Sequence, residues 1–307
     1  RQSLAEAQFY PNDYDGIWAS CPAINWTQFL ASGLWAVTVM NEYDHILGFH
    51  KINAFRDAVH NSVGGKENYF QVEERIDFDP YTILGQKTKG GKITEKDCLV
   101  MQEIWKGPHT TGNDFLWYSF LPGGTFWNKI IPIGSFYYPL IGKRPKCFSL
   151  VEQYVHLAFE DPKKDLLHLK IRDFEKVFDT CIRKLGWLSC DHADLRPFAN
   201  AGGKLIIDHG LDDPLIPVEG TIDYYHHMRE IHGGQNFIDR FCRLYINPGD
   251  GHGNCHTNGP GMTESTGIQA LMNWVEHNKA PENLPAVLVN QKTGKTIRKG
   301  IVKPWRV

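Results

Sequence analysis

The sequence predicts an α/β fold with a mostly parallel sheet, and two features of the chain indicate it. Short apolar runs typical of buried strands occur at residues 15–21, 204–208 and 241–246. Next to each run lies a stretch with the apolar spacing of an amphipathic helix. Strands that alternate with helices form a parallel sheet covered on both faces, so both ends of the chain are expected to contribute to one sheet.

A helix and a strand open the chain. Residues 3–9 have helical apolar spacing, and a turn at 11–13 leads into the strand at 15–21. The chain starts with Arg1 inside this helical pattern, with no loop or capping residue before it. We therefore expect a processed or truncated chain whose first strands and targeting signal lie upstream.

Two more strand and helix units follow near the other end. The run 204–208 leads into His209-Gly210, and the next helix is expected from near Glu219 to the glycine pair at 233–234. After the strand at 241–246, a final amphipathic helix places four apolar residues on one face: Ile268, Leu271, Met272 and Val275.

The middle of the chain breaks this alternation with Gly- and Pro-rich stretches and a concentration of large aromatic residues. We interpret it as an inserted lid domain at 44–195, between two parts of the core at 1–43 and 196–307. Most of its aromatic residues are expected to form the lid's own core. One or two, with Trp117 and Trp127 as candidates, are expected to line a substrate pocket.

Composition excludes several classes of protein. With 307 residues and 42% hydrophobic residues, the chain can bury one large core. Its net charge is −2 and its 33 Lys and Arg residues are scattered, so it lacks the basic stripe of a nucleic-acid binder. No run reaches the roughly 18 apolar residues that a membrane span needs.

Cysteines and a sequon favour a secreted, extracellular protein. The seven cysteines are dispersed and form no Cys-x-x-Cys pair, which argues against a zinc ribbon. Their odd number leaves at least one without an internal partner if the others form disulfides. The triplet Asn25-Trp26-Thr27 predicts N-glycosylation at Asn25.

The first motif with chemical meaning is the loop from His209 to Pro217, directly after a buried strand. A carboxylate here can orient a histidine from the neighbouring loop. We choose Asp213 over Asp212 because Pro214 fixes the loop behind it. The alternative role for Asp213 is an Asx turn or a helix cap, since Asp-Pro commonly starts a turn.

The second motif is the glycine-rich loop from Pro248 to His256, with His252 lying 39 residues beyond Asp213. Glycines let a histidine project into a crevice without steric hindrance. The order Asp then His, each after a predicted strand, matches the Ser, Asp, His order of α/β-hydrolases. A metal site made by His252, Cys255 and His256 is the alternative, but no second cluster supplies the remaining ligand.

Nearly the whole chain resembles the part of tannases and feruloyl esterases that follows their nucleophile. The similarity is carried by Arg1 to Gln8, Pro11 to Thr27, Phe78-Asp79-Pro80, Asp97-Cys98-Leu99, Ala201 to Tyr225, Pro248 to His252, Trp274-Val275-Glu276 and Ala280-Pro281. The stretch from Gly202 to Tyr225 is the most specific. The resemblance implies an α/β-hydrolase sheet with a lid, and favours Asp213 as the acid and His252, rather than His256, as the base of a triad.

The resemblance also implies what the chain lacks. In the family the serine lies in a Gly-x-Ser-x-Gly-Gly elbow just before the segment similar to Arg1-Gln2, and no Gly-x-Ser-x-Gly occurs in this sequence. The chain alone is therefore expected to be inactive and to need its N-terminal segment. With that segment, the expected reaction is hydrolysis of plant phenolic esters, feruloyl or galloyl, through an acyl-enzyme.

Two departures from the family pattern concern the lid and the base. Many relatives have a cysteine directly after the catalytic histidine, bonded to one before the serine. Here Gly253 takes that place; a bridge from Cys255 to an upstream cysteine and the absence of this bridge are the two alternatives. The aspartates that bind calcium in many lids are nearly absent from 60–68, so the calcium site is expected to be lost and no cofactor is expected. These losses leave open an inactive relative that binds phenolic or carbohydrate ligands; a metal-dependent hydrolase is the other alternative.

Overall fold

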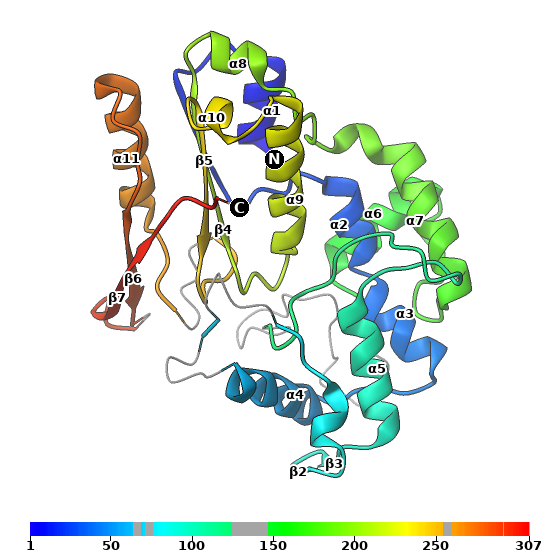
Figure 1. Ribbon diagram of the computed structural model, residues 1–307. Helices are drawn as coiled ribbons and strands as arrows, with labels where there is room; N and C mark the ends of the chain where they lie inside the picture. The colour runs from blue at the N-terminus through cyan, green and yellow to red at the C-terminus, as the bar shows by residue number, and fades with distance from the viewer. Residues whose placement is uncertain (64–68, 71–75, 125–146, 254–258, 291, 307) are drawn as a thin grey trace. The chain divides into compact units, whose positions relative to one another are not determined.

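The computed structural model describes residues 1–63, 69–70, 76–124, 147–253, 259–290 and 292–306 (Figure 1). The chain divides into two compact units. Unit 1 comprises 1–25, 66–74 and 189–307, and unit 2 comprises 26–65 and 75–188. Unit 2 therefore begins at Trp26, earlier than the predicted lid boundary at residue 44. Whether this unit acts as a lid stays a prediction.

Unit 1 contains the parallel sheet. Its strand order in the described part of the chain is β1-β4-β5, and both pairs are parallel. The strands span Gly16–Ser20, Lys204–Gly210 and Cys242–Asn247. Strands β4 and β5 are buried along nearly their whole length because apolar side chains point to both faces, as a sheet covered on two sides requires. The predicted α/β fold and its three strands are confirmed.

Helices cover both faces of this sheet. In Figure 1, α11 lies on one face, and α1 and α9 lie on the other. The unit 1 helices are α1 Gln2–Phe9, α8 Arg196–Asn200, α9 Val218–Ile231, α10 Gln235–Ile238 and α11 Glu264–His277. The sheet is thus the middle layer of unit 1, and loops continue from the ends of its strands.

The predicted face of the final helix is wrong in part. Ile268 and Met272 are 48% and 51% exposed, whereas Trp274 is 2% exposed. A Cβ added at Gly267 would lie 2.8 Å from the Trp18 ring, so the missing side chain lets α11 pack closely on β1. Helix α11 therefore turns Gly267, Leu271, Trp274 and Val275 toward the sheet, and leaves Ile268 and Met272 exposed.

A C-terminal hairpin, which the sequence analysis missed, extends unit 1. Strands β6 Leu284–Val289 and β7 Thr296–Val302 pair antiparallel. An isolated bridge between Tyr245 and Pro304 joins the chain after the hairpin to β5. Buried side chains of the hairpin share a core cluster with Trp274 and Tyr245, so the hairpin is part of the core of unit 1.

Unit 2 is mainly helical. Its elements are α2 Trp26–Ser32, α3 Trp35–Glu42, α4 Phe49–Ser62, η1 Pro80–Ile83, β2 Lys87–Thr88, β3 Gly91–Lys92, α5 Glu95–Lys106, α6 Ser149–Phe159, α7 Ile171–Leu185 and η2 Gly186–Leu188. Thr94 and Asp97 form a capping box that starts α5. The buried Asp97 also accepts hydrogen bonds from His45 and Lys51, which ties the start of α5 to α4 and to the loop before it. Among the described residues, no helix is long and apolar enough to cross a membrane.

Candidate active site

Asp213 lies in the loop that follows β4. Its Oδ1 accepts hydrogen bonds from the backbone N–H groups of Leu215 at 2.7 Å and Ile216 at 3.0 Å. This is the Asx turn that sequence reasoning gave as the alternative role, and it leaves Oδ2 free for other partners. The side chain is 0% exposed, so the carboxylate is fixed in a dry environment.

His252 lies in the loop that follows β5 and contacts this carboxylate. Its Nδ1 is 2.8 Å from Asp213 Oδ2, and its side chain is 34% exposed. Because a carboxylate only accepts, Nδ1 carries the proton and Nε2 is left with its lone pair. Within the described residues, Nε2 has no hydrogen-bond partner. The structure thus joins the two predicted side chains and leaves one ring nitrogen available as a base.

Two adjacent parallel strands explain why these loops meet. The carboxyl ends of β4 and β5 lie at the same edge of the sheet, where ligand sites of such folds form. The loops are locked by backbone hydrogen bonds from Leu211 to Asn247 and from Asp212 to Asp250, each 2.9 Å long. A Cβ at Gly210 would collide with the backbone of the His252 loop, so glycine is needed there.

The charges of the pair support each other. Burial alone would raise the pKa of Asp213, but hydrogen bonds and charges from His209 and His252 hold it well below its usual range. Burial likewise opposes the charged form of His252, yet the hydrogen bond and charge of Asp213 raise its pKa above the ordinary value. An ionised acid beside a histidine of raised basicity is the electrostatic arrangement of a general base.

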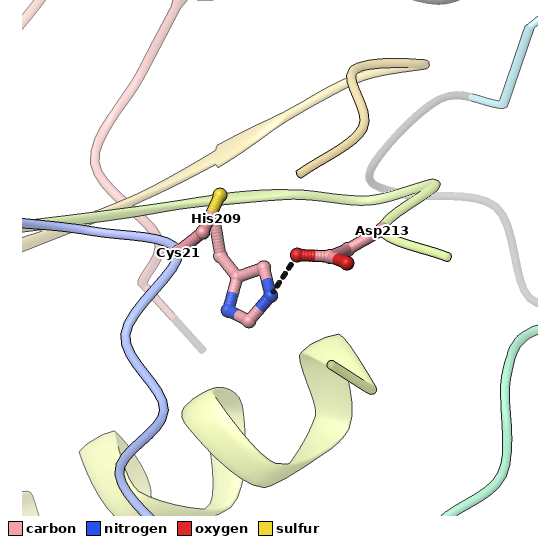
Figure 2. A group of neighbouring side chains, drawn as sticks. All are labelled: Cys21, His209 and Asp213. Atoms are coloured by element: carbon pink, nitrogen blue, oxygen red, sulfur yellow. Dashed lines mark hydrogen bonds and ion pairs between the residues drawn. The ribbon is translucent and has the colours of Figure 1, made fainter. Parts of the chain in front are cut away.

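A second histidine, which sequence reasoning did not assign, also binds Asp213. His209 is the penultimate residue of β4 and is 0% exposed. Its Nε2 is 3.1 Å from Asp213 Oδ2 and 3.2 Å from the carbonyl oxygen of Ile216, and its Nδ1 is 2.8 Å from Thr221 Oγ1. Figure 2 shows its ring pointing toward the carboxylate. The sequence signal was a histidine directly at the end of a buried strand.

The buried thiol of Cys21 lies against the loop that carries His252. Cys21 follows β1, with its Sγ 3.8 Å from the carbonyl oxygen of Gly251 and 3.2 Å from the backbone nitrogen of Gly253. Burial, then the charges of Asp213 and Asp208, raise the pKa of this thiol, so it stays protonated and can donate to Gly251 while accepting from Gly253. Cys21 therefore contacts both residues that flank His252.

The three residues of Figure 2 also have the chemistry of metal ligands. One ligand atom each of Cys21, His209 and Asp213 lies within 4.8 Å of the others. However, both ring nitrogens of His209 are used in hydrogen bonds, and the raised pKa of the thiol disfavours the thiolate that a metal needs. The cluster fits a hydrogen-bonded support better than a metal site.

The other predicted site residues are placed as follows. Trp117 lies in unit 2, is 8% exposed, and its buried Nε1 has no hydrogen-bond partner in the described part of the chain. Trp127 and Cys255 lie outside the described residues, as does part of the stretch 60–68. The Nδ2 of Asn25 donates to the carbonyl oxygen of Gly220 at 3.3 Å. The roles predicted for these residues stay predictions.

No disulfide forms among the six described cysteines: Cys21, Cys98, Cys147, Cys181, Cys190 and Cys242. All six are buried, which is common for thiols that act as small apolar side chains. The pairing suggested for Cys255 lies outside the described residues.

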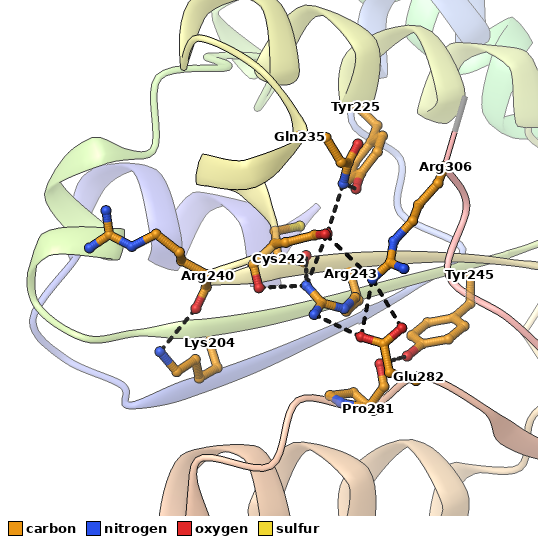
Figure 3. Close-up of polar contacts among 11 residues, drawn as sticks. Lys204, Tyr225, Gln235, Arg240, Cys242, Arg243, Tyr245, Pro281, Glu282 and Arg306 are labelled. Carbon is orange, nitrogen blue, oxygen red and sulfur yellow. Dashed lines mark hydrogen bonds and ion pairs between the residues drawn. The ribbon is translucent and has the colours of Figure 1, made fainter.

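A second polar cluster lies at the opposite end of β5. Arg243, 4% exposed, donates to Asp239 and to Glu282, and Arg306 also binds Glu282 (Figure 3). The Arg243 guanidinium lies 5.0 Å from the ring of Trp274. These charged groups pair with each other and tie the chain around the hairpin to the start of β5. We therefore interpret the cluster as structural.

Several known proteins are similar to this chain in sequence. Residues 143–305 match the family profile described as tannase and feruloyl esterase. A protein of Arthroderma benhamiae named "Probable feruloyl esterase" is 30% identical over 93% of this chain and 54% of its own length. The tannase of Aspergillus oryzae is 24% identical over 67% of this chain. The chain spans about half the length of the feruloyl esterases it matches.

Solved structures share the fold. The tannin acyl hydrolase from Aspergillus niger has a TM-score of 0.79 at 22% identity, and feruloyl esterase B from Aspergillus oryzae has 0.81 at 18% identity. Each covers 99% of this chain, and the chain covers 59% and 63% of them. At this identity the likeness establishes the α/β-hydrolase fold and nothing more specific.

Proposed function

This chain belongs to the tannase and feruloyl esterase family, and from that premise we propose that it supplies the acid and the base of a serine esterase acting on plant phenolic esters, feruloyl or galloyl. The contact that carries the proposal is the 2.8 Å hydrogen bond between Asp213 Oδ2 and His252 Nδ1, with the base partly exposed. The nucleophilic serine would come from a segment upstream of Arg1. Secretion is part of the same proposal, as is a role for unit 2 as a lid.

The proposed reaction uses each ring nitrogen of His252 for one task. Nδ1–H donates to Asp213, which fixes the tautomer, and Nε2 takes the proton of the serine as its oxygen attacks the ester carbonyl. The resulting imidazolium is stabilised by the ionised carboxylate. The same proton then passes to the departing alcohol, and an acyl-enzyme remains for hydrolysis by water.

The proposal is tested with the full-length protein and with this chain alone, using methyl ferulate and methyl gallate as substrates. The full-length protein is expected to release free acid, and this chain alone is expected to be inactive. His252→Ala in the full-length protein should lower kcat by several orders of magnitude with a much smaller change in KM. His232→Ala changes another buried histidine and serves as the matched control.

Two outcomes would overturn the proposal. Unchanged turnover in the His252 variant would mean that this pair is not the acid and base. A full-length protein that binds phenolic or carbohydrate ligands without hydrolysing either ester would instead indicate an inactive binding relative.

A further inference from the structure

Asp213 needs more than its catalytic partner to stay ionised. Its side chain is 0% exposed, and a buried carboxylate is costly unless donors surround it. Two donors are the backbone N–H groups at Oδ1, and the other two are His252 and His209 at Oδ2. Of the two side-chain donors, His252 is the one whose proton and ring take part in the proposed reaction.

The surroundings of His209 fix where its proton lies. Nε2 faces two groups that only accept, the Asp213 carboxylate and the carbonyl oxygen of Ile216, so Nε2 carries the hydrogen. Nδ1 faces the hydroxyl of Thr221, which can donate to it. Thr221 lies near the start of α9 and is 2% exposed. One neutral tautomer therefore satisfies every polar atom of the ring.

We propose that His209 is a positioning residue for the catalytic acid, held in its donating tautomer by the two acceptors at Nε2 and oriented through Nδ1 by Thr221, so that Asp213 stays ionised and oriented while His252 gains and loses its proton. The proposal rests on the proposed function. His209 cannot take the role of the base itself, because it is fully buried and both ring nitrogens have partners. The relay runs from Thr221 through His209 and Asp213 to His252.

The test compares three variants of the full-length protein. His209→Leu fills much of the imidazole volume but cannot donate, and His209→Gln can place an amide N–H near the position of Nε2. Thr221→Val keeps its shape and removes the hydroxyl, which leaves Nδ1 of the buried His209 without its partner and the ring less firmly oriented toward Asp213. The Leu variant should lose roughly ten- to a hundredfold in kcat, Gln should recover most of it, and Val should fall between.

A pH profile separates positioning from packing. Without the His209 donor, more of the carboxylate charge acts on His252, so the pKa of His252 should rise further. The acid limb of kcat/KM should move to higher pH in the Leu and Val variants. A histidine that only fills space would leave the limb in place. The same shift should appear when the ring of His252 is titrated by NMR, with or without activity.

Several results would overturn the inference. A folded Leu variant with wild-type kcat and an unmoved limb would do so, as would a folded Gln variant as defective as Leu. If the Leu variant does not fold, a Thr221→Val protein with wild-type kinetics and an unshifted His252 titration overturns it. Failure of the proposed function is distinguishable, since it would appear as full activity in His252→Ala.

Discussion

Replacing Asp213 with asparagine removes one charge while keeping the shape of the acid. The amide oxygen must serve the two backbone N–H groups of Leu215 and Ile216, which are 2.7 Å and 3.0 Å from Oδ1. The NH₂ group then occupies the place of Oδ2 and points a donor at His252 Nδ1. To accept it, the ring has to carry its proton on Nε2, where the serine proton is meant to go.

The cost of this wrong tautomer is large. Loss of the acid's charge in this way lowers turnover by about 10⁴-fold in serine proteases with the same arrangement, or roughly 5 kcal/mol of transition-state stabilisation. The asparagine NH₂ also faces His209 Nε2, which already carries a hydrogen, so the reverse orientation is the only alternative. That orientation would set the NH₂ against the two backbone donors, and neither arrangement restores the base.

The assay is initial-rate hydrolysis of methyl ferulate and methyl gallate by the full-length protein, with melting temperature as the check on folding. kcat should fall by about four orders of magnitude, with KM within a few-fold of wild type. Asp212→Asn is the matched control, because it changes the neighbouring carboxyl and leaves Asp213 in place. Turnover within tenfold of wild type for Asp213→Asn, or an equal loss for Asp212→Asn, would refute the assignment.

Three further predictions follow from the same loops. Asp213 raises the pKa of His252, and His252 must be neutral to act as the base. The acid limb of kcat/KM should therefore lie above the usual histidine pKa of about 6.5. A limb below that value would contradict the charge pairing. Gly210→Ala should lower activity roughly tenfold or more, because the new Cβ collides with the loop that carries His252. Gly186→Ala should be neutral, because Gly186 has helical backbone with open space around it. Steady-state kinetics and melting curves of both variants test this. Burial raises the pKa of Asp250 to about 7, so its favourable contribution to folding is complete below its unfolded pKa of about 3.9 and is lost as the pH rises through 7. Asp250→Asn, whose oxygen can still accept from Gly251, should therefore raise the melting temperature relative to wild type at pH 8 and not at pH 5; an equal effect at both pH values would speak against a titrating carboxyl.

Local patterns were sufficient to predict the parallel sheet of unit 1. The strands β1, β4 and β5 are apolar runs bounded by turn residues, and topology then places the loops after β4 and β5 at one edge of the sheet. That rule predicts that Asp213 and His252 lie near each other, and the loop conformations bring them into contact. The hairpin β6–β7 was missed although Gly294 lies in the short connection between two strand-like runs that end at Val289 and begin at Thr296, which is a readable hairpin signal.

Contacts that depend on loop conformation could not be predicted in this way. The Sγ of Cys21 contacts Gly251 and Gly253, which lie 230 and 232 positions further along the chain. Its backbone has φ of 41°, a left-handed conformation that residues with a Cβ rarely adopt. Nothing in the short strand sequence signals this conformation, because it arises where the end of β1 meets a loop from the far end of the chain.

The acid shows most directly how local and tertiary information divide. The sequence around Asp213 supplies two of its four hydrogen-bond donors, since the Asx turn forms within three residues. The other two come from His209 and His252, and the ring of His209 is oriented by its contact with Thr221. A carboxylate with only the local pair would remain buried with an unsatisfied oxygen, and its pKa would rise. The ionised acid that the proposed chemistry needs is therefore a property of the folded unit, whereas its position in the loop can be read from the sequence.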